Sequence, residues 1–105
     1  MITTALLGAM LMMQAAQQPR VVRYEATINN VKYVYGPAEP VARIRPGDIV
    51  ETNTLDAFGD VIKKKSDPFS LVKGDNPLTG PFYIEGAQPG DTLVVKPLEI
   101  GRAHV

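Results

Sequence analysis

The stretch DNPLTGPFYIEGAQPGDTL, residues 75–93, sets one short strand between two turns that are rich in proline and glycine. The second turn, Pro89-Gly90-Asp91, has a counterpart at Pro46-Gly47-Asp48, and an apolar run follows each of them. Proline fixes its own φ and glycine accepts a positive φ, so each pair predicts a tight turn between strands. Two copies are too few for a repeat array, and we therefore expect two similar corners of a β-sandwich or barrel.

Outward from these turns, short β-rich runs alternate with turn residues. The run RVVRYEATI, residues 20–28, alternates apolar and polar side chains, which is typical of a half-buried strand; its apolar face holds Val22, Tyr24, Ala26 and Ile28. Further strands are expected at 31–35, 41–45, 49–52 and 82–85, and after the second turn. The sequence therefore predicts a mainly β chain whose residues 20–98 form part of an antiparallel β-sandwich or barrel-like domain.

The apolar side chains of these runs supply only part of a core: Val22, Tyr24, Ile28, Val41, Ile44, Val50, Tyr83, Ile84, Val94 and Val95. A small antiparallel unit needs a second layer to bury its apolar face. The polar segment of residues 60–75 adds little to a core and reads as a lid-like loop. We therefore expect an incomplete domain that belongs to a longer protein.

Composition excludes several classes of function. The 105 residues include 11 basic and 11 acidic side chains, so the formal net charge is zero, and they include no cysteine. Balanced charge, with Lys63-Lys64-Lys65 as the one basic run, predicts no nucleic-acid partner. Without cysteine there is no disulfide, thiolate metal site or cysteine nucleophile, and no serine has a histidine nearby for a catalytic triad.

Residues 5–16, ALLGAMLMMQAA, form an uncharged apolar run that ends in small residues. This length fits the apolar centre of a secretory signal peptide and is short for a bilayer span. We expect residues 1–16 to be a signal peptide cleaved after Ala15 or Ala16, and the mature protein to be periplasmic or secreted without a membrane span. Because no Lys or Arg lies near Met1, the alternative is a cytoplasmic protein with a buried N-terminal helix, or a different start codon.

The last residues, 99–105, read EIGRAHV, which one reading frame of a widely used sequencing adapter encodes. We therefore expect these residues to be a tail that the gene does not encode. The one histidine of the chain, His104, lies in this tail. It is not expected to bind a metal or to act as a base.

Asp56 is the first candidate for chemistry, because it follows an expected strand in the segment TNTLDAFGD. A carboxylate in this position can bind a hard cation or act as a general base, and a metal-bound water can attack an amide carbonyl. The competing interpretation is a turn in which Asp56 accepts the backbone N–H two residues further on. Spacing alone favours the turn.

The second candidate is the loop NPLTGP, residues 76–81. Its two prolines stiffen it, and Gly80 lets the backbone approach a ligand closely. N–H groups beside Gly80 can hold an oxyanion, and Asn76 can orient an amide substrate. From the residues alone, a rigid turn that feeds the next strand is the simpler interpretation.

Taken in order, PVARIRPGDIVETNTLDAFGD and DNPLTGPFYIEGAQPGDTLVV resemble the N-terminal part of the acetamidase/formamidase family, over about residues 31–98. The specific part is NPLTGP followed by a strand and EGA-x-PGD. The resemblance implies a hydrolase that cleaves carbon–nitrogen bonds of short linear amides and releases ammonia, with a largely β fold and a divalent metal of unknown identity. It implies Asp56, Asn76, Thr79 and Gly80 as catalytic residues, with Asp56 as a metal ligand.

Members of this family are much longer than this chain, and their later histidine- and glycine-rich motifs have no counterpart here. The resemblance therefore implies an N-terminal fragment that is inactive alone, whose partner is a small amide and which can form a homo-oligomer. The alternative function is a non-enzymatic, extracytoplasmic β-sandwich binding module. In that case Asp56 and Asn76 are purely structural.

Overall fold

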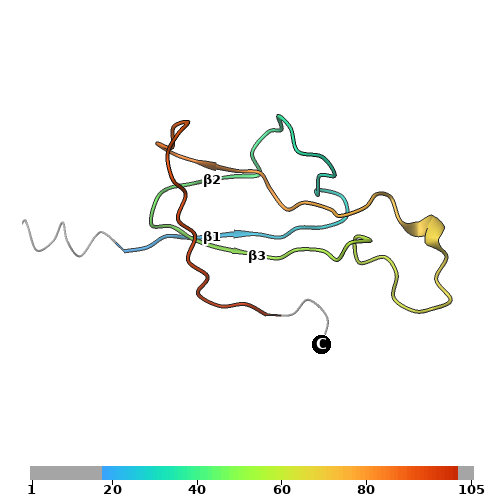
Figure 1. Ribbon diagram of the computed structural model, residues 1–105. Coiled ribbons are helices and arrows are strands. Elements are labelled where there is room, and N and C mark those ends of the chain that lie inside the picture. The colour runs from blue at the N-terminus through green and yellow to red at the C-terminus, as the bar shows by residue number, and fades with distance from the viewer. Residues whose placement is uncertain (1–17, 102–105) are drawn as a thin grey trace, which may run out of the picture.

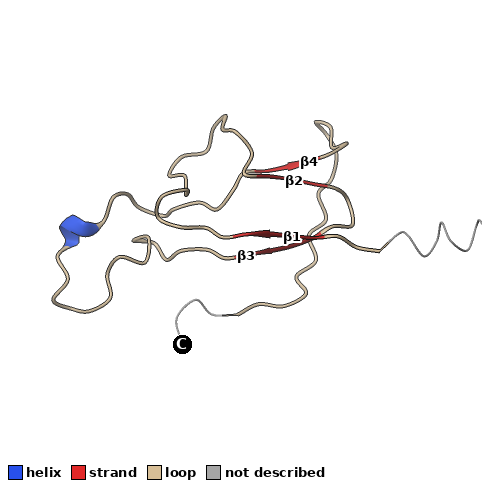
Figure 2. Cartoon of the chain, turned by 180° about the vertical axis from the view of Figure 1, so that it is seen from behind, coloured by secondary structure: helices blue, strands red, loops and turns tan. Residues whose placement is uncertain are grey.

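The computed structural model describes residues 18–101, and short strands are its main regular elements (Figure 1). The strands are β1 (Val21–Tyr24), β2 (Ala42–Ile44), β3 (Ile49–Thr52) and β4 (Phe82–Ile84), and a 3-10 turn, η1, covers Phe69–Leu71. Turns and loops make up most of the remainder (Figure 2). A mainly β chain is thus confirmed for this range. The expected signal peptide and residues 102–105 of the expected tail lie outside it.

The strands pair in parallel, as two separate two-stranded sheets (Figure 2). β1 pairs with β3, with Val21 opposite Ile49, and β2 pairs with β4, with Ala42 opposite Phe82. Within residues 18–101, the antiparallel contact is an isolated bridge between Lys32 and Leu78. The prediction of antiparallel pairing is therefore wrong for these strands, and the described part of the chain forms neither a sandwich nor a barrel.

The turn between β2 and β3 accounts for the difference. The N–H of Asp48 donates to the carbonyl of Arg45 at 3.0 Å, and Gly47 has a φ of 89°. Proline at the second position and a positive-φ glycine at the third make this a type II turn, which splays the flanking strands instead of pairing them as a hairpin. The chain leaves the turn beside β1, so β2 and β3 lie in different sheets. Strands in a parallel pair must be joined by a long crossover, and here residues 25–48 and 45–81 make those two connections.

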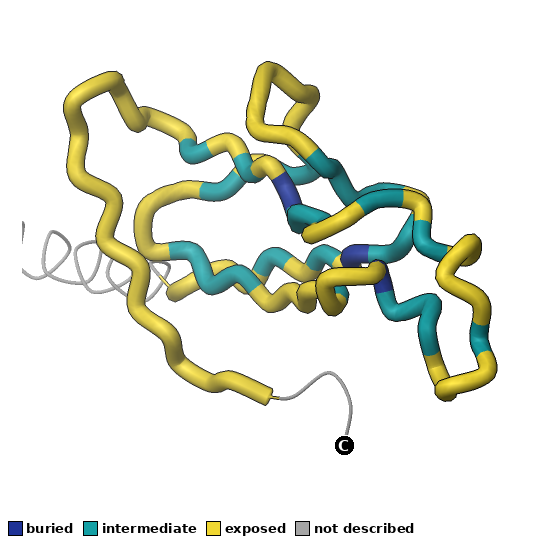
Figure 3. Tube along the Cα trace, turned by 45° about the vertical axis from the view of Figure 1, so that its right-hand side comes forward, coloured by how far each residue is buried: buried dark blue, intermediate teal, exposed yellow. Residues whose placement is uncertain are grey.

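Burial alternates along β1 as its sequence predicts. Val22 and Tyr24 are partly buried while Val21 and Arg23 are exposed, and Ala26, just beyond the strand, is 3% exposed. Ala26 is the one buried hydrophobic residue in the described range, and Figure 3 shows most of the tube as exposed or intermediate. The rings of Tyr24 and Phe82 meet edge to face at 5.8 Å, which links β1 to β4. The core is therefore thin and lies between the two sheets.

Other parts of the predicted β pattern are wrong. Val31–Tyr35 contributes the Lys32 bridge and no strand, and Tyr35 is 92% exposed. Tyr83 is 44% exposed because it points to the opposite face of β4 from Phe82 and Ile84, where the guanidinium of Arg43 lies 4.0 Å from its ring centroid. Val94 and Val95 are 83% and 73% exposed because no strand pairs with the segment that holds them. The remaining expected core residues are partly buried: Val22, Tyr24, Ile28, Val41, Ile44, Val50 and Ile84.

Candidate functional site

Asp56 organises the loop that follows β3. Its Oδ1 accepts the N–H groups of Phe58 and Asp60, both at 2.9 Å, and Oδ1 of Asp60 accepts the N–H of Asp56 at 2.8 Å. Gly59 and Asp60 have positive φ values of 75° and 61°, which glycine and aspartate tolerate best. The turn that the sequence offered as the alternative is thus present. Asp56 holds this loop in shape whatever chemistry it also performs.

Close packing of Gly59 against the side chain of Ile28 holds the Asp56 loop in position. This glycine is buried, and a Cβ at its position would lie 2.5 Å from Cδ1 of Ile28. The carbonyl of the neighbouring Ala57 accepts the N–H of Asn76 at 2.9 Å. The Asp56 loop therefore contacts the second predicted segment directly.

The NPLTGP loop is equally constrained. Asn76 has a φ of 55°, Lys32 and Leu78 exchange backbone hydrogen bonds at 3.0 and 2.7 Å, and Oγ1 of Thr79 donates to the carbonyl of Asn53 at 2.9 Å. Gly80 is buried with a φ of 118°, a conformation that favours glycine. Pro81 has no N–H, so any oxyanion contact from the backbone here falls to Thr79 and Gly80. The four residues predicted from the sequence thus lie on two loops that touch.

Asn53 is the residue that the sequence interpretation missed, because it stands within the segment TNTLDAFGD, in which only Asp56 was a candidate. Its Oδ1 accepts the N–H of Ala26 at 2.8 Å, and its Nδ2 donates to the carbonyl of Ala26 at 3.0 Å. Together with the Thr79 contact, these bonds join the ends of β1 and β3 to the NPLTGP loop. An asparagine directly after a strand was the signal, since its side chain can replace the next backbone pair of the ladder.

A shallow, open hollow lies where β1 and β3 end. Its lining residues are Arg23, Tyr24, Glu25, Glu51, Thr52 and Asn53. Nε of Arg23 lies 3.1 Å from Oε2 of Glu51, and both side chains are largely exposed. Through Asn53, whose carbonyl accepts the hydroxyl of Thr79 at 2.9 Å, the hollow adjoins the NPLTGP loop.

The divalent metal that the sequence resemblance implies needs more ligands than this region offers. Within residues 18–101, no three His, Cys, Asp or Glu side chains lie close enough together to hold a metal ion. Asp56 offers a single carboxylate, and its Oδ1 already accepts two N–H groups. The described residues therefore do not by themselves make a metal site.

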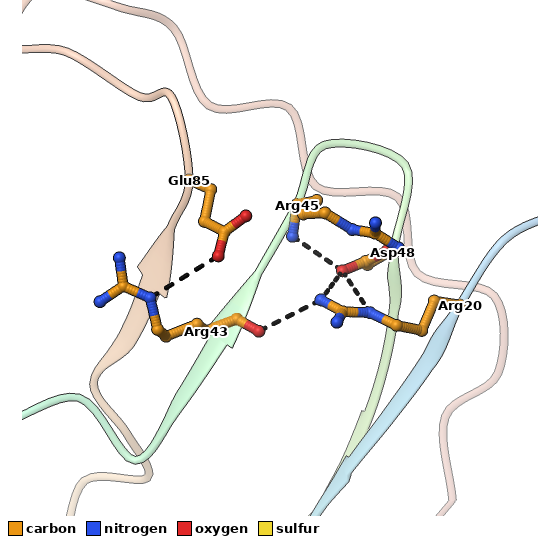
Figure 4. Close-up of polar contacts among 5 residues, drawn as sticks. All are labelled: Arg20, Arg43, Arg45, Asp48 and Glu85. Carbon is orange, nitrogen blue, oxygen red and sulfur yellow. Dashed lines mark hydrogen bonds and ion pairs between the residues drawn. The ribbon is translucent and has the colours of Figure 1, made fainter.

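Charged side chains cluster at the opposite, N-terminal ends of β1 and β3 (Figure 4). Oδ2 of Asp48 lies 2.6 Å from Nη2 and 3.2 Å from Nε of Arg20, and it also accepts the N–H of Arg45 at 2.8 Å. Arg20 further donates to the carbonyl of Arg43 at 3.3 Å, which joins the two sheets. The hydrogen bonds from Arg20, and then that from Arg45, lower the pKa of Asp48 below its usual 3.8.

The chain matches the sequence profile of the Acetamidase/Formamidase family over residues 25–104. It belongs to this family. The matched range includes Asn53, the Asp56 loop and the NPLTGP loop, which the structure brings into contact. It also runs into the expected tail at 99–104, and the origin of that tail stays a prediction.

The other comparisons add nothing to the family assignment. No curated protein and no solved structure matched this acetamidase/formamidase chain. In the part of the chain that the structure describes, no helix is long and apolar enough to cross a membrane.

Proposed function

We propose that this chain is the N-terminal part of an exported amidohydrolase that cleaves the carbon–nitrogen bond of short linear amides and releases ammonia. Family membership over residues 25–104 carries the proposal. The contact between the two predicted loops supports it, because Ala57 and Asn76, and likewise Asn53 and Thr79, are joined by hydrogen bonds of 2.9 Å. A hydrolytic site has to bring such segments together.

Amide hydrolysis needs three contributions: a water activated for attack, donors for the oxyanion, and a proton for the leaving nitrogen. In the proposed reaction water adds to the carbonyl carbon, the carbon–nitrogen bond breaks, and ammonia leaves with a proton that the water gave up. Asp56 would act as the base or as one ligand of a divalent metal. Asn76 would orient the amide, and the N–H groups of Thr79 and Gly80 would face its oxygen.

These groups make part of a site, and the rest would come from a longer chain. Burial supports a longer chain, because one hydrophobic residue is buried in the described range while Leu93, Val94 and Val95 are 65%, 83% and 73% exposed. A larger β domain, closed as a sandwich or barrel, would cover them. Any further metal ligands, and the proton donor, would lie outside residues 18–101.

Export is a separate part of the proposal. It rests on the apolar run at residues 5–16 and on the absence of cysteine. We propose a periplasmic or secreted enzyme, with a cytoplasmic one as the alternative.

The test is ammonia release from formamide and acetamide by the product of the completed gene. Asp56→Asn keeps the shape of the carboxyl group and removes its charge, so a base or metal ligand at this position predicts a large fall in turnover with little change in melting temperature. Asp67→Asn is the matched control, because Oδ2 of Asp67 also accepts loop N–H groups, from Lys63 at 2.8 Å and Lys64 at 3.1 Å.

The turn bonds of Asp56 favour one alternative, a non-enzymatic binding module. In that case Asp56→Asn and Asp67→Asn behave alike: each keeps an oxygen for its loop N–H groups and lowers stability by about 1 kcal/mol at most, and the completed protein releases no ammonia with or without either change. A completed protein that folds but releases no ammonia from any short amide would contradict the enzymatic proposal.

A further inference from the structure

The two Pro-Gly-Asp turns have the same structure. In the first, the N–H of Asp48 donates to the carbonyl of Arg45 at 3.0 Å, and the N–H of Arg45 donates to Oδ2 of Asp48 at 2.8 Å. In the second, Asp91 and Gln88 form the same two bonds at 3.0 and 2.8 Å. The central glycines have φ values of 89° and 93°. What the first turn does in the protein is therefore a guide to the second.

The first turn is docked on a strand. The side chain of Asp48 is 4% exposed because Arg20, the residue before β1, covers it with contacts of 2.6 and 3.2 Å (Figure 4). The carbonyl of Arg20 also accepts the N–H of Ile49 at 2.8 Å, and β3 then pairs in parallel with β1. The aspartate of the first turn thus pairs with an arginine, and the apolar run after the turn pairs in parallel with the strand that follows this arginine.

The second turn has no such strand in the described part of the chain. Residues 85–101 are all exposed, and no backbone hydrogen bond joins residues 92–101 to the rest of residues 18–101. Figure 3 shows this segment as an exposed tube that stands away from the sheets. Yet Thr92–Val95 carries β-branched and apolar side chains like those of β3, directly after the same turn.

We propose that Thr92–Val95 is a β-strand whose partner is a parallel strand preceded by an arginine, and that this arginine pairs with Asp91 as Arg20 pairs with Asp48. The partner belongs to the same polypeptide, downstream of residue 98, so the inference rests on the proposal that the gene product is longer. Both described strand pairs form within the chain, and both are parallel. A third pair of the same kind continues that pattern.

A second copy of the chain is the rival occupant. Two identical strands related by a two-fold axis across the sheet edge pair antiparallel, which would place Asp91 opposite Lys96. In that arrangement Asp91 would contact a lysine, whereas Asp48 contacts two nitrogen atoms of one arginine. The new strand pair would also be antiparallel, whereas both described pairs are parallel. The internal repeat therefore favours the arginine strand.

The completed gene product tests this with Asp91→Asn and Asp48→Asn as a matched pair. Asparagine keeps an oxygen for the N–H of Gln88 or Arg45, so each variant leaves the turn bond in place and removes the charge that an arginine would pair with. We expect both variants to lower the urea midpoint by similar amounts. Hydrogen exchange of the unmodified protein should show the amides of residues 92–95 to be as slow as those of β3.

Four results would overturn the proposal. The first is a urea midpoint that Asp91→Asn leaves unchanged while Asp48→Asn lowers it, and the second is fast hydrogen exchange of the amides of residues 92–95. The third is a gene that ends at Val105, and the fourth is a dimer that the Lys96→Glu change dissociates. Ammonia release separates this inference from the proposed function. An active enzyme with fast exchange at 92–95 would refute the strand alone. An inactive protein with slow exchange there would refute the amidase and keep the strand.

Discussion

Replacing Asn53 with alanine should destabilise the completed protein by about 2–4 kcal/mol, because both backbone groups of Ala26 lose their partner at once. The Asn53 side chain binds the N–H of Ala26 at 2.8 Å and its carbonyl at 3.0 Å, and Ala26 is 3% exposed. A buried backbone group left without a partner costs about 1–3 kcal/mol. Two such groups give about 2–6 kcal/mol, and because Asn53 itself is exposed, water enters part of the vacated space and the expected cost lies in the lower part of that range.

Asn30→Ala is the matched control for this measurement. Asn30 also makes two backbone contacts, accepting the N–H of Thr27 at 2.7 Å and donating to the carbonyl of Glu25 at 3.0 Å. Glu25 is exposed, so water can replace the lost bond, and we expect a cost of about 1 kcal/mol. Urea unfolding followed by circular dichroism gives both free energies by linear extrapolation. If Asn53→Ala costs no more than Asn30→Ala, burial at Ala26 does not set the cost and the reasoning is wrong.

Three further predictions concern the ends of the chain and its acid stability. Resequencing the locus should show that residues 99–105 are not encoded, and a stop codon directly after the codon for Val105 would contradict this. N-terminal sequencing of the exported full-length product should begin near Ala16 or Gln17, whereas a cytoplasmic product that retains Met1 would rule out the leader. Because folding lowers the pKa of Asp48 below 3.8, its carboxylate stabilises the protein fully above that pH and loses this effect as the pH falls through the folded value. Urea midpoints between about pH 5 and pH 2 should therefore fall less steeply for Asp48→Asn than for the unmodified protein, and parallel curves would count against the Arg20 contact.

The local features of this fold could be read from the sequence, and the strand partners could not. Burial in β1 follows the alternation of Val22, Tyr24 and Ala26, and both Pro-Gly-Asp turns form with positive φ at Gly47 and Gly90. These features depend on residues that are neighbours along the chain. Pairing depends on where a turn sends the next strand, and the type II turn before β3 splays its flanking strands, so each strand pairs with a segment that is distant in the sequence.

In the candidate site too, the sequence predicts contacts between neighbours in the chain but not contacts between distant segments. The turn bond of Asp56 to the N–H of Phe58 involves residues two apart, and the sequence predicts it. The hydrogen bonds between Asn53 and Ala26 join two segments that are far apart in the chain, and an asparagine after a strand does not indicate which distant residue it will bind. The contact between Ala57 and Asn76 is equally non-local. The family resemblance is the sequence signal that assigns both loops to one site.

The interleaved strand order has a consequence for synthesis. Because β1 pairs with β3 and β2 with β4, the first sheet cannot form until Thr52 has been made, nor the second until Ile84. Contacts between distant segments form slowly, and a ribosome adds about 5–20 residues per second. A nascent chain that ends between β3 and β4 therefore carries β2 with both of its edges unpaired. During that interval the unpaired edges of β2 are open to pairing with other chains, the general hazard that chaperones limit.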